Sequence, residues 1–262
     1  MSMLESYTRQ SALIGHTGFV GSNLAEQFAF RYLFNSKNIS EIKNRRFDLV
    51  VCAGISAMKW IANKKPAEDW SQIRVLLENL ESVTADRFVL ISTIDVYPKP
   101  IEVDEDFDPA QVENHAYGRH RLMVEQFIAS RFPLHHIVRL PGLFGKGLKK
   151  NLIFDLLNNN CLDLINSEST FQYYDLSKLW HDIQKVMKLD IRLINLSTGP
   201  LAVKTILDRF FSGVAVGGNP GPAAHYNFLS KYAAAWNGNN GYLYSADQTL
   251  QNLAAFIVGN RR

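Results

Sequence analysis

The chain has 262 residues, of which 47% are hydrophobic and 20% charged, and this composition is typical of a globular protein. A formal net charge of +3 gives no reason to expect nucleic acid or a membrane surface as a partner. Cys52 and Cys161 lie far apart, which indicates neither a disulfide framework nor a metal site, and a reducing compartment fits. Without a signal-peptide pattern or an apolar run of about 18 residues, we expect a cytoplasmic protein.

The first half of the chain alternates short apolar runs with helical patterns. The apolar runs are typical of strands that are buried on both faces of a parallel sheet. In chain order we expect a strand at 10–14, a helix at 19–30, a short strand around 29–34, a strand at 47–52, a helix at 67–81, a strand at 87–92, a helix at 116–131 and a strand at 135–139. This alternation predicts an α/β fold with a doubly wound parallel sheet of the Rossmann type.

The second half has a less regular pattern. We expect a helix at 148–159, an extended segment at 162–174, a helix at 176–188, a strand at 191–196, a helix at 201–211, a loop at 212–222 and a last helix at 245–259 with Ser245 as its N-cap. A boundary near residue 145 then separates a Rossmann domain, residues 1–145, from residues 146–262. The latter are expected to form a small C-terminal substrate lobe and to complete the sheet.

The strongest motif is GHTGFVG at 15–21, which follows the first strand and precedes the first helix. Gly15 allows a tight turn, Gly18 lets the backbone approach a pyrophosphate, and Gly21 lets the helix pack near the sheet. The N–H groups of the helix N-terminus then face the anion, so we expect NAD or NADP here, with an empty glycine-rich turn as the alternative. The predicted cofactor contacts in this turn and after the 47–52 strand are Gly15, Thr17, Gly18, Phe19, Val20, Gly21, Ala53 and Gly54.

A second cofactor signal concerns the ribose. NAD sites usually carry an acid about 20 residues after the glycine turn. Here the second strand ends in Asn35, Ser36 and Lys37, which are expected to contact the cofactor, and no carboxylate stands among them. Ser36 and Lys37 could bind a 2′-phosphate, which favours NADP, or form a solvated surface turn. Glu41, a little farther on, leaves NAD open.

Five further segments, in this order, accompany the glycine turn: STIDVYP (92–98), AYGRHRLMVEQ (116–126), VRLPGLFGKG (138–147), FQYYDLSKL (171–179) and INLSTG (194–199). Together they resemble the extended short-chain dehydrogenase/reductase family over nearly the whole chain. That family includes nucleotide-sugar epimerases, dehydratases and keto-reductases. The glycine turn and the Ser/Thr–Tyr pair are its specific motifs.

The resemblance implies three catalytic residues. Thr93 matches the family's catalytic Ser/Thr, and its hydroxyl is expected to bond the reacting sugar oxygen. Tyr117 matches the tyrosine of Tyr-x-x-x-Lys and is the expected general acid/base. Arg121 replaces the family lysine. It keeps a positive charge beside the phenol and could bond the nicotinamide ribose, but its planar fork is not equivalent to an ammonium group.

The resemblance also bears on the reaction. Family dehydratases place Asp-Glu after the catalytic Thr, whereas Ile94-Asp95 stands here, so epimerisation or keto-reduction is favoured over dehydration. Asp95, Arg139 and Lys146 are the expected substrate contacts. A family asparagine three residues after the arginine is replaced by Gly142.

These motifs favour an NAD(P)-dependent epimerase or 4-keto-reductase that acts on a nucleotide-activated sugar. The alternatives are a catalytically weak NAD(P) sensor and a structural subunit of the same fold; the intact glycine turn opposes the latter. The sequence leaves the oligomeric state open, with a homodimer as one alternative. No metal site is expected, because the four histidines near the site lack ligand spacing; they are His115, His120, His135 and His136.

Overall fold

The computed structural model describes residues 9–260, which fall into two compact units. The first unit contains the chain up to Pro98, Asp108–Arg139 and Ser177–Ile194. The second contains Lys99–Phe107, Leu140–Leu176 and the chain from Asn195 onward. The chain therefore passes between the units several times, whereas the sequence suggested one boundary near residue 145.

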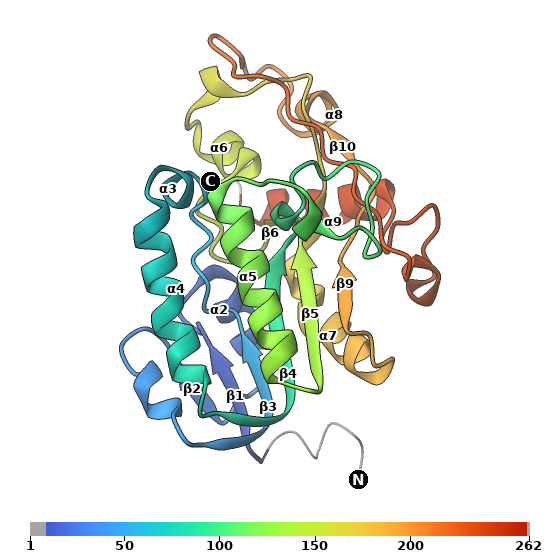
Figure 1. The fold of residues 1–262 in the computed structure, drawn as a ribbon. Helices are drawn as coiled ribbons and strands as arrows, with labels where there is room; N and C mark the ends of the chain where they lie inside the picture. Colours follow the sequence, from blue (N-terminus) through green and yellow to red (C-terminus); the bar gives the residue numbers. More distant parts are fainter. Residues whose placement is uncertain (1–8, 261–262) are drawn as a thin grey trace. The chain divides into compact units, whose positions relative to one another are not determined.

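A six-stranded sheet with the order β2-β1-β3-β4-β5-β9 forms the centre of the first unit (Figure 1). Its strands are β1 (Ser11–Ile14), β2 (Tyr32–Phe34), β3 (Arg46–Cys52), β4 (Thr84–Thr93), β5 (His135–Leu140) and β9 (Leu193–Asn195). Strand β1 pairs in parallel with β2 and β3, and β3 pairs in parallel with β4. All four residues of β1 are buried, as are the last four of β3, which is expected of strands covered on both faces.

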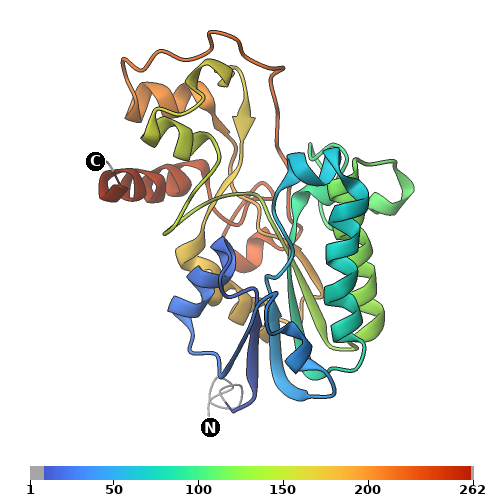
Figure 2. The same cartoon turned by 90° about the vertical axis from the view of Figure 1, so that its left-hand side faces the viewer.

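Helices cover both faces of this sheet (Figure 2). Helices α4 (Pro66–Leu80) and α5 (Ala116–Arg131) lie on one face, and α2 (Phe19–Gln27) and α7 (Leu179–Lys188) lie on the other. Gln27 Oε1 accepts a hydrogen bond from the Trp180 backbone N–H at 3.0 Å, and Phe28 stacks on the Trp180 ring at 4.2 Å, which joins the end of α2 to α7. The predicted doubly wound α/β sheet is confirmed.

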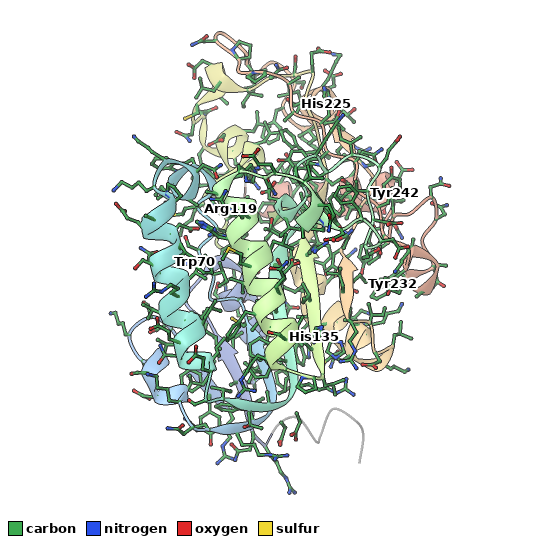
Figure 3. The ribbon with its side chains drawn as sticks, in the orientation of Figure 1. Trp70, Arg119, His135, His225, Tyr232 and Tyr242 are labelled. Atoms are coloured by element: carbon green, nitrogen blue, oxygen red, sulfur yellow. The ribbon has the colours of Figure 1, made fainter. Side chains whose placement is uncertain are left out.

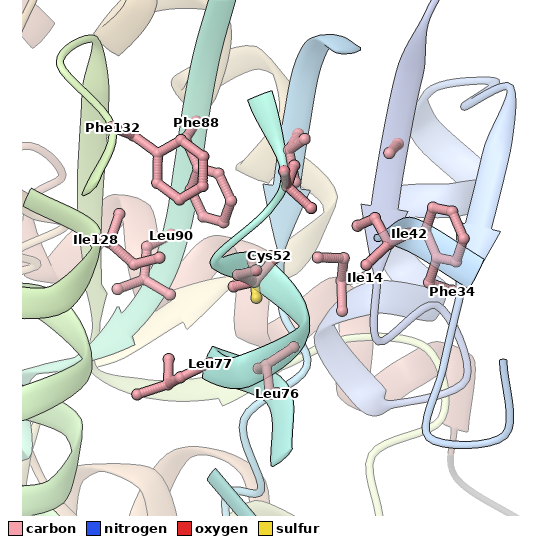
Figure 4. Packing of buried hydrophobic residues seen from close by; sticks show 14 of the residues in the cluster. Ile14, Phe34, Ile42, Cys52, Leu76, Leu77, Phe88, Leu90, Ile128 and Phe132 are labelled. Carbon is pink, nitrogen blue, oxygen red and sulfur yellow. The ribbon is translucent and has the colours of Figure 1, made fainter. Parts of the chain in front are cut away.

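The core between the sheet and the α4–α5 layer is almost wholly apolar (Figure 4). Phe88 of β4 stacks on Phe132 at 4.3 Å, directly after α5. Leu76 and Leu77 of α4 pack with Cys52 at the end of β3. Because cores of this kind are close-packed, they fix where each strand ends, and the strand ends carry the candidate site.

Several short elements were not predicted. Helix α3 (Lys59–Lys64) precedes α4, and it proves to matter for the site. The single-turn 3₁₀ helices are η1 (Ile39–Ile42), η2 (Ile94–Val96), η3 (Pro109–Gln111), η4 (Leu162–Leu164), η5 (Leu176–Lys178) and η6 (Ala233–Trp236). The prediction for 19–30 was too long, because the helix ends at Gln27 and Phe28 is extended.

The second unit contains short strands and three helices. Strands β6 (Gly142–Phe144) and β8 (Tyr173–Asp175) pair in parallel, and β7 (Thr170–Phe171) pairs antiparallel with β10 (Leu201–Ala202). The helices are α6 (Leu152–Asn158), α8 (Val203–Phe210) and α9 (Ala246–Asn260). Their buried side chains form a separate core. The segment 162–174 is only partly extended, because it starts with a 3₁₀ turn.

The predicted N-cap of the last helix is confirmed. Ser245 Oγ accepts the Gln248 N–H at 3.1 Å, and Gln248 Oε1 accepts the Ser245 N–H at 2.8 Å, which is a reciprocal capping box. Between residues 9 and 260, no helix combines the length and the apolar character needed to cross a membrane.

Candidate active site

The strand order defines where a ligand can bind the sheet. Strand β1 lies between β2 and β3, so the chain continues in opposite directions from β1 and β3. Open α/β sheets bind ligands at the carboxyl ends of two such strands. The glycine turn follows β1, and Ala53 and Gly54 follow β3. The Gly15 N–H donates to the Phe34 carbonyl at 2.7 Å, and the Ala53 N–H donates to the Ile14 carbonyl at 2.9 Å. The predicted cofactor segments thus meet at one edge of the sheet.

Packing within the protein explains two of the three glycines. Gly15 has a φ of +86°, a conformation that favours glycine, and a Cβ there would overlap the backbone of Ala53. A Cβ at Gly21 would overlap the Gly15 carbonyl, so glycine is needed for α2 to start this close to β1. Both residues therefore have the roles expected from the motif.

Gly18 is different, because the protein's own packing restricts this position less than it restricts Gly15 and Gly21. Its φ is −79°, and the nearest atom to a Cβ at this position would be the Gly15 carbonyl oxygen at 3.3 Å. Gly18 is exposed and is the N-cap of α2, a helix with no side-chain cap and no acidic residue in its first turn. The exposed backbone and the positive end of the helix dipole fit a pyrophosphate.

The turn after β2 lies beside the glycine turn. The Asn35 N–H donates to Asn38 Oδ1 at 2.7 Å, and the Lys37 N–H donates to Asn35 Oδ1 at 2.8 Å, which fixes the turn. Ser36 and Lys37 are exposed. His16, which sequence reasoning did not single out, reaches the Phe34 carbonyl with Nδ1 at 3.1 Å. The described turn 35–38 presents amide, hydroxyl and ammonium groups but no carboxylate.

The catalytic pair expected from the sequence comes together at the end of β4. Tyr117 lies in the first turn of α5 and is 6% exposed. Burial raises the pKa of Tyr117, and the Arg121 charge and a hydrogen bond from Thr93 act in the opposite direction, while the charge of Asp95 adds to the rise. Without a cofactor, Tyr117 is therefore a protonated phenol at neutral pH.

Arg121 lies beside Tyr117, but most of its donors are committed elsewhere. Its two terminal nitrogens bind the Asp69 carboxylate at 2.6 and 2.9 Å, and Nη2 also donates to the Ser56 carbonyl at 2.5 Å. The guanidinium carbon lies 3.9 Å from the centre of the Tyr117 ring, so the positive charge of Arg121 faces the ring. Arg121 therefore keeps its positive charge beside Tyr117, and a bond from Arg121 to the nicotinamide ribose stays a prediction.

One donor of Arg121 remains for a ligand. Arg121 is 3% exposed, and within residues 9–260 its Nε–H has no hydrogen-bond partner. A buried donor without a partner is costly unless something binds it. A contact between Arg121 and a ribose hydroxyl stays a prediction.

Asp69 of α4 also holds a second side chain. His120 Nδ1 lies 2.7 Å from Asp69 Oδ2, and Trp70 packs on the His120 ring at 5.4 Å between centroids. Figure 3 labels Trp70 on α4 and Arg119 on α5; Arg119 is exposed. Asp69 therefore links α4 to the buried face of α5, an arrangement that no local sequence signal indicated.

A second charge pair lies on the other side of Thr93. Lys59 Nζ of α3 is 2.9 Å from Asp95 Oδ1, and the Asp95 N–H donates to Thr93 Oγ1 at 3.2 Å. Asn63, one helical turn after Lys59, accepts the Tyr117 N–H with Oδ1 at 2.9 Å. Asp95 thus lies near Thr93 and Tyr117, and its contact with a substrate stays a prediction; Lys59 and Asn63 escaped sequence reasoning.

Close packing and capping fix the start of α5. A Cβ at Gly118 would overlap the Asp95 carbonyl and the Asn114 amide, so only glycine lets α5 approach η2. Asn114 Nδ2 donates to the Asp95 and Val96 carbonyls at 3.0 and 2.9 Å. His115 Nδ1 accepts the Gly118 N–H at 3.0 Å as the helix cap.

Arg139 does not have the predicted role of a substrate contact. It is 2% exposed, forms a bidentate pair with Glu125 of α5 at 2.6 to 3.2 Å and donates to Tyr97 Oη at 2.7 Å. Ser92 Oγ donates to the same Glu125 at 2.5 Å. The Arg139 guanidinium therefore joins β5 to α5. Lys146 is exposed in the second unit, and its substrate contact stays a prediction.

Neither histidines nor cysteines form a metal site in the part of the chain that the structure describes. His136 is fully buried and bonds the Ile191 carbonyl through Nδ1 at 2.7 Å, and His135 bonds the Phe132 carbonyl at 2.9 Å. Burial raises the pKa of Cys52 to about 11, so this thiol stays protonated at neutral pH.

Comparison with known proteins indicates the fold. No protein-family model matches the chain, and no curated protein matches it in sequence. Solved structures match it along most of its length. MoeE5 in complex with UDP-glucuronic acid and NAD is 16% identical with a TM-score of 0.76, covering 97% of this chain and 99% of that one.

Two further matches carry other activities in their names. The dTDP-4-dehydrorhamnose reductase from Bacillus anthracis, in complex with NADP, is 18% identical with a TM-score of 0.73, covering 95% of this chain and 98% of its own. The UDP-glucose 4-epimerase from Thermotoga maritima, with UDP-glucose, is 15% identical with a TM-score of 0.66, covering 86% and 91%. This chain therefore has the same Rossmann-type fold as these solved structures.

Proposed function

We propose that this chain, which has the fold of NAD(P)-dependent nucleotide-sugar enzymes, is itself an NAD(P)-dependent enzyme that reduces or epimerises a nucleotide-activated sugar at a hydroxyl or carbonyl carbon. The observation that carries the proposal is the contact between Thr93 and Tyr117 at the end of β4. This pair lies at the same sheet edge as the glycine turn, since β4 neighbours β3 and β3 neighbours β1. A phosphate cradle and an acid/base pair at one edge support a redox site.

The chemistry divides between the cofactor and the protein. A bound nicotinamide supplies hydride transfer. Tyr117 gives a proton to a carbonyl oxygen as that carbon is reduced, or takes it from the hydroxyl in the reverse direction, and the Thr93 hydroxyl holds the same oxygen. Because burial raises the pKa of Tyr117, the phenol is protonated in the protein without cofactor and can donate that proton to a carbonyl oxygen.

We further propose NADP as the preferred dinucleotide. The glycine turn fits the pyrophosphate of either cofactor. The neighbouring turn presents the hydroxyl of Ser36 and the ammonium of Lys37. Residues 35–38 include no carboxylate, which would repel a 2′-phosphate. An acid at this place is the usual partner of the NAD ribose.

Binding measurements test the proposal directly. NADH and NADPH are titrated by their fluorescence, and thermal unfolding is measured with UDP-glucose, UDP-glucuronic acid and dTDP-sugars, with UDP and dTDP as controls. A ligand at about 100 times its Kd stabilises the folded state by about 2.7 kcal/mol, which is easily seen as a rise in Tm. If neither dinucleotide binds, the proposed function is wrong.

Arg121 supports a second candidate, a sensor that binds NAD(P) without turnover. Its terminal nitrogens are held by Asp69 and Ser56, so it cannot act as a mobile ammonium group does. The two candidates predict different results from the same panel. A sensor binds NAD(P) but neither binds nor converts a nucleotide sugar.

A further inference from the structure

An acid/base tyrosine needs a nearby cation, because a positive charge favours the phenolate through which proton transfer passes. The nearest sequence candidate, Arg121, faces the Tyr117 ring, and its terminal nitrogens are bound to Asp69 and the Ser56 carbonyl. A cation on the Thr93 side of the phenol has to come from another element.

Helix α3 provides one. Lys59 and Asn63 are four residues apart and therefore share a face of α3. Asn63 fixes that face against the start of α5, because its Oδ1 accepts the Tyr117 N–H at 2.9 Å. Lys59 Nζ then meets the Asp95 carboxylate at 2.9 Å, and Asp95 is bonded through its N–H to Thr93. The Lys59 ammonium is thus held in the cluster that contains the catalytic pair.

We propose that Lys59, held by Asp95 beside Thr93 and Tyr117, is the positioning residue whose positive charge supports proton transfer at Tyr117. The inference rests on the proposed function, because such a charge has a role only if Tyr117 exchanges a proton. It assigns to α3 a role that the resemblance places on position 121. The Lys59 side chain is 38% exposed.

The groups around Tyr117 come from α3, β4, η2 and α5, and from the helix cap His115. Arg121 lies on the ring face, Asp95 of η2 and Lys59 of α3 lie on the Thr93 side, and the His115 ring is 6.3 Å away between centroids. Burial lowers the pKa of His115, and Lys59 lowers it further, so this histidine is neutral at pH 7. Among the charges, Arg121 lowers the pKa of Tyr117 most, Asp95 raises it, and Lys59, the ion-pair partner of Asp95, lowers it by less and so offsets part of the effect of Asp95.

The test is a titration of Tyr117 itself in the full chain without cofactor. All tyrosines are replaced biosynthetically by 3,5-difluorotyrosine, whose phenol ionises at lower pH, and ¹⁹F NMR follows each ring. The Tyr117 signal is the one that Tyr117→Phe removes. The variants are Lys59→Gln and, as a matched control, Lys64→Gln, which removes the same charge from the other end of α3.

We expect the Tyr117 titration to move to higher pH in Lys59→Gln and to stay unchanged in Lys64→Gln. Asp95→Asn should shift the Tyr117 titration in the opposite direction, to lower pH, because it removes a negative charge. An unchanged titration in Lys59→Gln, or a shift equal to that of Lys64→Gln, would overturn the inference. Failure of the proposed function is distinguishable, because it appears as absent NAD(P) binding, whereas this failure occurs in a chain that binds the dinucleotide.

Discussion

The glycine turn and the region around Tyr117 lie at the same edge of the sheet but are formed in different ways. The latter, the Tyr117 corner, consists of Thr93, Tyr117, Arg121, Asp69, Lys59 and Asp95. The turn is built almost entirely from residues 15–21, and its geometry follows from three glycines and the start of α2. The corner is assembled by contacts between residues far apart, such as Arg121 with Asp69 and Lys59 with Asp95. A sequence motif therefore predicts the glycine turn. It does not predict which cation lies beside Tyr117, because that cation is positioned by residues far away in the sequence.

The largest expected effect is on turnover at the corner. Tyr117→Phe keeps the ring over Arg121 and removes only the hydroxyl, so the fold and cofactor affinity should be preserved. With a nucleotide sugar that the protein converts, kcat should fall by roughly 10²- to 10⁴-fold, because a positioned acid/base is lost. Thr93→Val should impair the same step. Wild-type turnover by Tyr117→Phe would refute the catalytic assignment.

Asp69→Asn tests whether the corner depends on its buried ion pair. Arg121 would keep its charge in a buried site without its carboxylate partner, so the free energy of unfolding should fall by about 3–5 kcal/mol. Urea unfolding measures this loss. Asp86→Asn is the matched control, because its pair with Arg46 is largely exposed and should contribute only about 0–1 kcal/mol. Equal losses in the two variants would show that Asp69 has no special role.

The same pair predicts a pH dependence. Burial raises the pKa of Asp69, but hydrogen bonds and charge from Arg121 and His120 outweigh it, and the net pKa is below the usual value. A carboxyl with a lowered folded-state pKa stabilises the fold above its unfolded pKa of about 3.9, and that stability is lost as pH falls through the folded pKa. Stability should therefore drop below about pH 4 more steeply in wild type than in Asp69→Asn. Parallel profiles would contradict this account.

A smaller effect is expected at the turn after β2. If the Lys37 ammonium contacts a 2′-phosphate, Lys37→Ala should weaken NADPH binding about tenfold, or 1.4 kcal/mol, and leave NADH binding unchanged. Lys43→Ala, which removes another exposed lysine six residues later, serves as the control. A clear preference for NADH that Lys37→Ala leaves unaltered would rule out the NADP proposal while leaving the fold assignment intact.

The sequence predicted the local features well and the long-range ones poorly. The helix at 116–131 was placed correctly, because the features that start and end it are local: its N-cap His115 and its C-cap Phe132 directly adjoin the segment. Arg121 and Asp69 are 52 residues apart, and no periodicity or motif connects them. The same holds for Arg139, an expected substrate contact that pairs with Glu125 in the fold.

Cofactor binding at Gly18 tests the central claim most directly, because a Cβ there would meet a single protein atom, the Gly15 carbonyl oxygen at 3.3 Å, whereas one at Gly15 or Gly21 would overlap backbone. Kd values for NADPH and NADH are measured for wild type, Gly18→Val and the control Gly221→Val, whose added side chain would meet open space. Circular dichroism shows that each variant is folded. We predict that Gly221→Val binds like wild type and that Gly18→Val binds at least about tenfold more weakly. A folded Gly18→Val that binds both dinucleotides as tightly as wild type would contradict the account.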